Sequence, residues 1–139
     1  MKRLLLAAGI VILLLSGCSS AAPSERDAKS TPTPSQEPAD TYATVTDLRD
    51  AFVAAGGACP DWRQTDRVKL AAQSGDCSDS TVLSIYSSET DRDQIVENLK
   101  SFGMGVHLLV GENWIVNVEA PERYADALGG TVVTKPPDQ

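Results

Sequence analysis

A segment without large apolar side chains divides this chain and decides which residues can fold. Residues 19–40 read SSAAPSERDAKSTPTPSQEPAD and, apart from four prolines, hold no apolar side chain larger than that of alanine. Such a segment buries too little surface to offset its conformational entropy, so we expect residues 18–40 to form a disordered tether. A packed core is then expected only within residues 41–135, a size at which burial alone stabilises a fold marginally.

The residues before the tether have the layout of a secretory signal peptide. Lys2 and Arg3 give a positive start, residues 4–15 are apolar or small, and Ser16 and Gly17 are small. The export machinery reads this order of charge, apolar run and small residues. The 12 residues of the run rise about 18 Å as a helix, well short of the ~30 Å hydrocarbon core. A retained membrane helix is therefore the weaker alternative.

The four residues Leu15-Ser16-Gly17-Cys18 resemble the lipobox of bacterial lipoprotein precursors. The resemblance implies that the Cys18 thiol receives a diacylglycerol and that a signal peptidase removes residues 1–17 by cutting between Gly17 and Cys18. It also implies that some bacteria acylate the new amino group. Two acyl chains are enough for stable anchoring, so we expect a protein held at the extracytoplasmic face of the cell membrane. The alternative is an ordinary secretory signal in which Cys18 is incidental.

The charge of the remaining chain limits its partners. Without residues 1–17 the chain has 122 residues with 10 basic and 19 acidic side chains, a formal charge of −9. An acidic surface repels phosphates, so no nucleic-acid partner is expected. It also disfavours direct contact with anionic lipid, so the lipid on Cys18 is the expected contact with the membrane. We expect a monomeric domain whose partner is an envelope protein or the cell wall.

The other two cysteines, Cys59 and Cys77, are expected to form a disulfide, because exported domains favour such bonds. The bridge would stabilise the fold by ~3 kcal/mol in the chain-entropy model. Free thiols or a redox couple are the alternatives. The 18-residue separation lacks the Cys-x-x-Cys spacing that lowers a thiol pKa, which makes the redox alternative weaker.

Three helices are expected between residues 41 and 135. The patterns Thr44-x-x-Asp47 and Ser88-x-x-Asp91 are typical of helix caps, and each precedes apolar residues at helical spacing. Gly56 and Gly103 are expected to end these two helices. The third helix is expected over residues 121–128, with Pro121 in its first turn.

Strands are expected at residues 66–72, 81–87, 106–110, 114–118 and 131–134, with turns at 73–80 and 111–113. The resulting order is α-β-β-α-β-β-α-β. This order predicts an α+β domain, a small antiparallel sheet with its helices packed on one face. Residues 136–139 are expected to be a disordered tail.

A second resemblance lies in the carboxyl-terminal part. Residues 111–130, GENWIVNVEAPERYADALGG, together with the signal and the small size, are similar to small actinobacterial lipoproteins of unknown function. This resemblance implies no activity. It adds only that a lipid-anchored, extracytoplasmic protein is the expected class.

The sequence indicates no catalytic residue, no metal ligand set and no cofactor. His107 has neither a second histidine nor a spare thiol beside it for a typical zinc site, so it is interpreted as a solvated strand residue. Asp66, Asp76 and Asp79 lack the spacing of a calcium loop and are interpreted as turn residues. The serines at 78, 80, 84 and 87 lie outside the motifs of serine nucleophiles.

Trp62 and Trp114 are the candidate recognition residues, because an exposed indole binds sugars or partner side chains well. The alternative for each is packing, Trp114 in the core and Trp62 over the disulfide. These observations favour a non-catalytic binding module of the cell envelope. A small envelope enzyme or thiol redox protein using Cys59 and Cys77, and a structural module of the cell wall, remain as alternatives.

Overall fold

The computed structural model describes residues 41–139, and this part of the chain folds into an antiparallel sheet of six strands with three helices. The helices are α1 (Val45–Ala54), α2 (Glu89–Ser101) and α3 (Glu122–Leu128). The strands are β1 (Arg63–Gln64), β2 (Gln73–Asp76), β3 (Val82–Ile85), β4 (Val106–Val110), β5 (Trp114–Asn117) and β6 (Thr131–Lys135). The predicted α+β class is confirmed. The predictions for Gly17, Cys18 and the tether lie outside the described residues.

The strands follow the order β1-β2-β3-β5-β4-β6, and every neighbouring pair is antiparallel. β3 and β5 form the centre of the sheet, with Leu83 opposite Val116. β4 lies between β5 and β6, with Leu108 opposite Val133. β1 and β6 are therefore the two edge strands of this sheet.

Side-chain caps begin the first two helices as predicted. At α1 the Asp47 N–H donates to the Thr44 hydroxyl (3.1 Å), and the Thr44 N–H donates to the Asp47 carboxylate (3.0 Å). At α2 the Asp91 N–H donates to the Ser88 hydroxyl (3.1 Å). Such caps satisfy N–H groups that have no partner inside the helix. After α2, Gly103 adopts a φ of 73°, a left-handed conformation that favours glycine and ends the helix.

The strand predicted at residues 66–72 is wrong, and the turn predicted at residues 73–80 contains β2 instead. Asp66 and Leu70 have φ angles of 49° and 65°, which no strand accommodates. Asp66 folds the loop back on β2, because its carboxylate accepts from the Ser74 N–H (2.9 Å) and its N–H donates to the Ser74 carbonyl (3.0 Å). The short β1 strand was also not predicted, so the observed order has one strand more.

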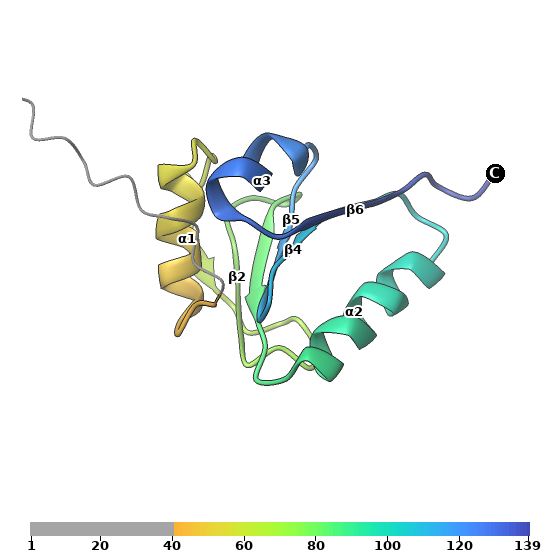
Figure 1. Ribbon diagram of the computed structural model, residues 1–139, viewed down its shortest axis with the longest axis horizontal. Helices are drawn as coiled ribbons and strands as arrows, with labels where there is room; N and C mark the ends of the chain where they lie inside the picture. Colours follow the sequence, from red (N-terminus) through yellow and green to blue (C-terminus); the bar gives the residue numbers. More distant parts are fainter. Residues whose placement is uncertain (1–40) are drawn as a thin grey trace, which may run out of the picture. The chain divides into compact units, whose positions relative to one another are not determined.

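The helices cover both faces of the sheet (Figure 1). On one face Phe52 of α1 and Leu128 of α3 pack with Val116, and on the other Val96 of α2 packs with Ile115. The prediction that all helices share one face is therefore wrong. Its physical reason lies in β5, where Trp114, Ile115 and Val116 are all buried and need cover on both sides.

Both ends of the described segment are fastened to the domain. The Asn113 side chain, in the turn between β4 and β5, accepts from the Tyr42 N–H (2.9 Å) and donates to the Tyr42 carbonyl (2.8 Å). In the tail that was expected to be disordered, the Asp138 N–H donates to the Gly103 carbonyl (2.9 Å), and Lys135 pairs with the Asp138 carboxylate (2.7 Å).

Candidate functional site

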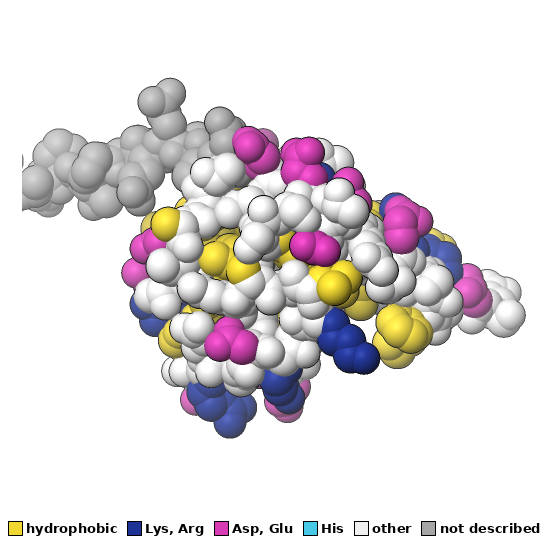
Figure 2. Space-filling model, turned by 90° about the horizontal axis from the view of Figure 1, so that it is seen from below, with side chains coloured by type: hydrophobic (Ala, Val, Ile, Leu, Met, Phe, Trp, Pro, Cys, Tyr) yellow, Lys and Arg dark blue, Asp and Glu magenta, His cyan; other side chains and the backbone are white. Residues whose placement is uncertain are grey.

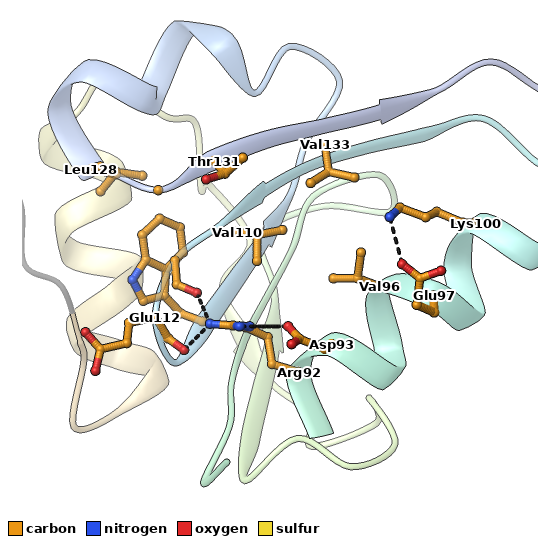
Figure 3. A pocket seen from close by; sticks show the side chains of 14 residues that line it. Arg92, Asp93, Val96, Glu97, Lys100, Val110, Glu112, Leu128, Thr131 and Val133 are labelled. Atoms are coloured by element: carbon orange, nitrogen blue, oxygen red, sulfur yellow. Dashed lines mark hydrogen bonds and ion pairs between the residues drawn. The ribbon is translucent and has the colours of Figure 1, made fainter. Parts of the chain in front are cut away.

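A groove of about 530 Å³ lies between α2 and the strands β4 and β6 (Figure 3). Val96 of α2, Val110 of β4 and Val133 of β6 point into it, and Leu128 lines the end near α3. Thr131 adds a hydroxyl from β6. The groove exists because α2 contacts the sheet through few side chains, and Val96 is its one buried residue.

Arg92 ties α2 to the turn between β4 and β5 at one end of the groove. Its Nη1 donates to the Gly111 carbonyl (2.8 Å) and to the Glu112 carbonyl, and its Nη2 pairs with the Asp93 carboxylate (2.7 Å). The Arg92 side chain is only 14 % exposed. Hydrogen bonds from a charged donor are stronger than neutral ones, so this guanidinium fixes the position of α2.

The remaining charged side chains of the groove lie along its rim. Lys100 pairs with Glu97 on the next turn of α2 (2.8 Å), while no ion pair among residues 41–139 involves Glu112. With Asp93 and Arg92, the lining carries three acidic and two basic residues. Figure 2 shows acidic, basic and hydrophobic side chains interspersed on one face of the domain.

Trp114 also lines the groove, but its side chain is only 1 % exposed. The indole meets the Tyr42 ring edge-on, with 5.8 Å between ring centroids. It also lies so close to Gly111 that a Cβ there would overlap the indole. Its Nε1 has no hydrogen-bond partner among the described residues. Trp114 is thus part of the core rather than an exposed recognition surface.

Trp62 lies on another part of the domain, away from the groove lining. The Arg49 guanidinium stands over its ring at 5.4 Å from the centroid. The other neighbour is Gly75 of β2, where a Cβ would overlap the indole. Trp62 is half-buried against the same core cluster as Cys59 and, unlike Trp114, does not line the groove.

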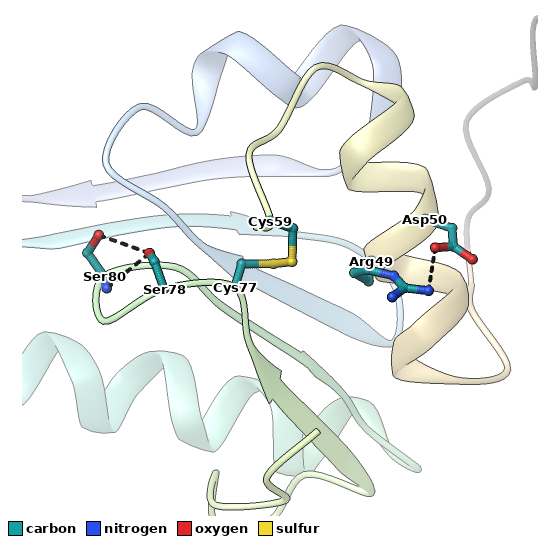
Figure 4. The surroundings of a disulfide bond; sticks show 6 residues. All are labelled: Arg49, Asp50, Cys59, Cys77, Ser78 and Ser80. Atoms are coloured by element: carbon teal, nitrogen blue, oxygen red, sulfur yellow. Dashed lines mark hydrogen bonds and ion pairs between the residues drawn. A yellow bond between two sulfur atoms is a disulfide. The ribbon is translucent and has the colours of Figure 1, made fainter. Parts of the chain in front are cut away.

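A disulfide joins Cys59 and Cys77, the pair expected from the sequence, with 4.3 Å between their Cα atoms (Figure 4). Cys59 follows α1, and Cys77 follows β2 at the start of the turn to β3. Cys77 is fully buried. Cys59 is half-buried, so the bridge connects the loop after the first helix to a buried position beside the sheet.

The polar residues considered for chemistry lie apart. His107 is exposed on β4 opposite Thr134, and the Asp76 carboxylate is buried in an ion pair with Arg67. Among residues 41–139 no group of three or more His, Cys, Asp and Glu is arranged to hold a metal ion. Within the same range, none of the helices combines the length and apolar character needed to cross a bilayer.

Two tyrosines have perturbed acidity because they are buried. Burial raises the pKa of Tyr86 above the usual value of about 10, and the hydrogen bond between its hydroxyl and that of Ser84 (2.9 Å) opposes this shift. Burial likewise raises the pKa of Tyr42. Ser84, one of the serines considered as a nucleophile, is 4 % exposed and its hydroxyl is used in this pair.

Sequence reasoning missed the groove and the exposed edge of β6. The only sequence signal for this region was the β-branched run of residues 131–134, which predicted a strand but not its place in the sheet. No family model, curated protein or solved structure matches this chain. The assignment of function therefore depends on the residues and on the geometry of the groove.

Proposed function

We propose that this protein is a lipoprotein of the bacterial cell envelope whose α+β domain is a non-catalytic binding module. The lipobox-like residues 15–18 support an anchor on Cys18 at the extracytoplasmic face of the cell membrane. The observation that carries the binding role is the groove between α2 and the edge strand β6.

The dimensions and lining of the groove support binding. Its volume of about 530 Å³ lies within the range of ligand sites in proteins, which is about 300–1,000 Å³. The half-buried Val110 and Val133 supply apolar surface, and Thr131 and five charged side chains supply polar groups. Apolar surface combined with polar groups that can orient a partner supports a binding role.

The disulfide supports a structural rather than a redox role for Cys59 and Cys77. Thiol–disulfide exchange requires a thiolate to reach a sulfur atom; Cys77 is fully buried and Cys59 is half-buried, which restricts this access. The bridge also links the segment after α1 to the sheet. This covalent link stabilises the fold because it limits the entropy of the unfolded chain. Neither cysteine lines the groove, so the proposed binding role does not involve the disulfide.

The anchor is tested by expressing the wild type and Cys18→Ala in a bacterium that processes lipoproteins, with an alkyne analogue of palmitate in the medium. We expect the wild type to carry the label and to remain with membranes, and the variant to lose both. The double variant Cys59→Ala/Cys77→Ala is the matched control, because it retains Cys18 and should stay labelled. An unmodified amino terminus at another position in the wild type would overturn the anchor.

The binding role is tested by photo-crosslinking in cells, with the crosslinking amino acid placed either at Glu97 or at Asp50. Glu97 lines the groove on α2, whereas Asp50 is exposed on α1. We expect Glu97 to capture a recurrent envelope partner that Asp50 does not. Identical, non-recurrent products from both positions would contradict the binding role and leave a structural function for the domain.

A further inference from the structure

The edge strand β6 leaves one row of backbone groups unpaired, and the hydrogen bonds of its neighbour show which row it is. The Gly111 N–H donates to the Trp114 carbonyl (2.9 Å), and the Val118 N–H donates to the His107 carbonyl (3.1 Å). In β4 the residues with odd numbers therefore direct their backbone groups toward β5. Antiparallel pairing alternates, so the residues with even numbers direct theirs toward β6.

The register between β4 and β6 then decides the orientation of β6. Leu108 stands opposite Val133, and Thr131 and Lys135 also stand opposite residues of β4 with even numbers. The residues of β6 with odd numbers therefore direct their backbone groups toward β4. Val132 and Thr134 consequently direct their N–H and C=O groups away from the sheet. Within residues 41–139 no strand lies on that side of β6. The outer edge of β6 thus offers two N–H donors and two C=O acceptors, spaced so that the backbone of an extended peptide can pair with them.

The residues of β6 leave this edge open to pairing. Four of its five residues are β-branched, which favours a regular extended strand. Proteins that block an edge use a charge, a proline or a bulge within the strand. Here Lys135 is the last residue of β6, and the prolines at 136 and 137 follow it.

The groove continues from the same strand. The side chains of Thr131 and Val133 line it, so a chain added beside β6 has every second side chain on the α2 side of the sheet. There the half-buried Val133 offers apolar contacts, and Glu112 offers a negative charge without an ion pair among residues 41–139. Arg92 pairs with Asp93 and Lys100 with Glu97, so the five charged residues of the lining keep a net charge of −1, within a segment (residues 41–139) that has 15 acidic and 8 basic residues.

We propose that the partner binds as an extended peptide segment rich in β-branched and basic residues, which pairs with the outer edge of β6 as an additional strand. Main-chain hydrogen bonds to Val132 and Thr134 supply the pairing, and the groove selects alternate side chains. This inference rests on the proposed binding function and adds the chemical class of the partner. A second copy of this chain is disfavoured because both copies carry an acidic excess, 19 acidic against 12 basic residues.

The test is a selection of random decapeptides on the full lipidated chain held in detergent micelles. We expect the selected peptides to alternate β-branched residues with Lys or Arg. They should bind Val132→Pro at least tenfold more weakly than the wild type, because proline removes an outward N–H. Val132→Thr is the matched control and should bind within twofold. The Val132 N–H is not used by β4, so the proline variant should retain its unfolding midpoint.

A second measurement needs no variant of the protein. N-methylation of alternate residues in a selected peptide removes the donors that face β6, so one of the two methylation patterns should weaken binding at least tenfold. Equal binding of both methylated peptides and of Val132→Pro would overturn strand addition while the binding function stood. Failure to select any peptide, or selection of acidic ones, would overturn the proposed partner class. A dimer of the wild type that Val132→Pro abolishes would assign the edge to a second copy instead.

Discussion

The two faces of the sheet differ in how closely their helices pack. On the face of α1 and α3, Leu48, Phe52 and Leu128 are at most 2 % exposed, and the disulfide adds a covalent link. On the other face α2 buries only Val96, while its Ile95 and the other apolar side chains of the helix are half-buried. The first face holds a core cluster of 12 buried residues, and the second holds a cluster of 5 beside the groove.

Within about 95 residues, this difference separates the face that stabilises the fold from the face to which we assign the proposed binding. A small domain needs most of its apolar contacts to remain folded, and regions with few buried contacts open at lower free energy. The proposed binding surface therefore lies where the fold depends least on buried contacts. The Arg92 hydrogen bonds compensate for the few buried contacts of α2, because they give the helix a defined position without filling the groove.

The sharpest test of this comparison makes the same substitution on both faces. Leu48→Ala should reduce the free energy of unfolding by about 2–5 kcal/mol, because it leaves a cavity in a fully buried site. Leu99→Ala, on α2, should cost only about 1 kcal/mol because Leu99 is half-buried. Chemical denaturation followed by circular dichroism measures both values. Equal losses would show that the two faces contribute alike.

Removal of the disulfide should have the next largest effect. Cys59→Ala/Cys77→Ala frees the unfolded chain and should lower the free energy of unfolding by about 3 kcal/mol. Urea denaturation of the variant and of the wild type gives the difference. Cys18→Ala is the control and should leave the unfolding of the domain unchanged. A variant as stable as the wild type would mean that α1 stays packed on the sheet without the disulfide.

A smaller and more local effect is expected from Arg92→Ala. Loss of a charged donor to the Gly111 and Glu112 carbonyls should cost about 1.5–3 kcal/mol. Hydrogen exchange should show faster exchange of amides in α2, with those of α1 unaffected. Arg123→Ala, an exposed arginine on α3, should leave both rates unchanged. If α1 and α2 lost protection equally, the two faces would unfold as one unit.

The smallest effect concerns alkaline pH. Burial raises the pKa of Tyr86 and Tyr42 in the folded state, so above about pH 10 the unfolded state loses these protons first. The stabilisation is complete below that pH and decreases as the pH rises further. Tyr86→Phe should flatten the decrease in unfolding free energy between pH 9 and 11, roughly the range around the unperturbed pKa. An unchanged slope would contradict this assignment.

Local signals in the sequence predicted much of the fold. Thr44 and Ser88 mark helix starts because a cap depends on residues only three positions away. The disulfide was predicted because the lipid expected on Cys18 leaves Cys59 and Cys77 as the remaining pair. The strand predicted at 66–72 failed because the alternation of Val68 and Leu70 imitated a half-buried strand, whereas Leu70 is 45 % exposed in a loop.

The candidate site was not predictable in the same way. Strand order decides which backbone groups stay free, and a single sequence does not determine that β6 lies at an edge beside β4. Trp114 was a candidate recognition residue because it follows the turn expected at residues 111–113. Its burial depends on Gly111 and Tyr42, and Tyr42 is 72 residues away along the chain. Such long-range packing leaves no short pattern in the sequence.

The Asn113 side chain, which holds both backbone groups of Tyr42, has a mechanical consequence. For a protein anchored at Cys18, a pull from the bilayer enters the domain at Tyr42 and loads these two hydrogen bonds before any strand. Arg92 donates hydrogen bonds to two carbonyls of the same turn. Under the proposed anchoring and binding, tension would thus reach the margin of the groove, and the affinity for a partner would depend on the distance between the membrane and the structure that carries the partner.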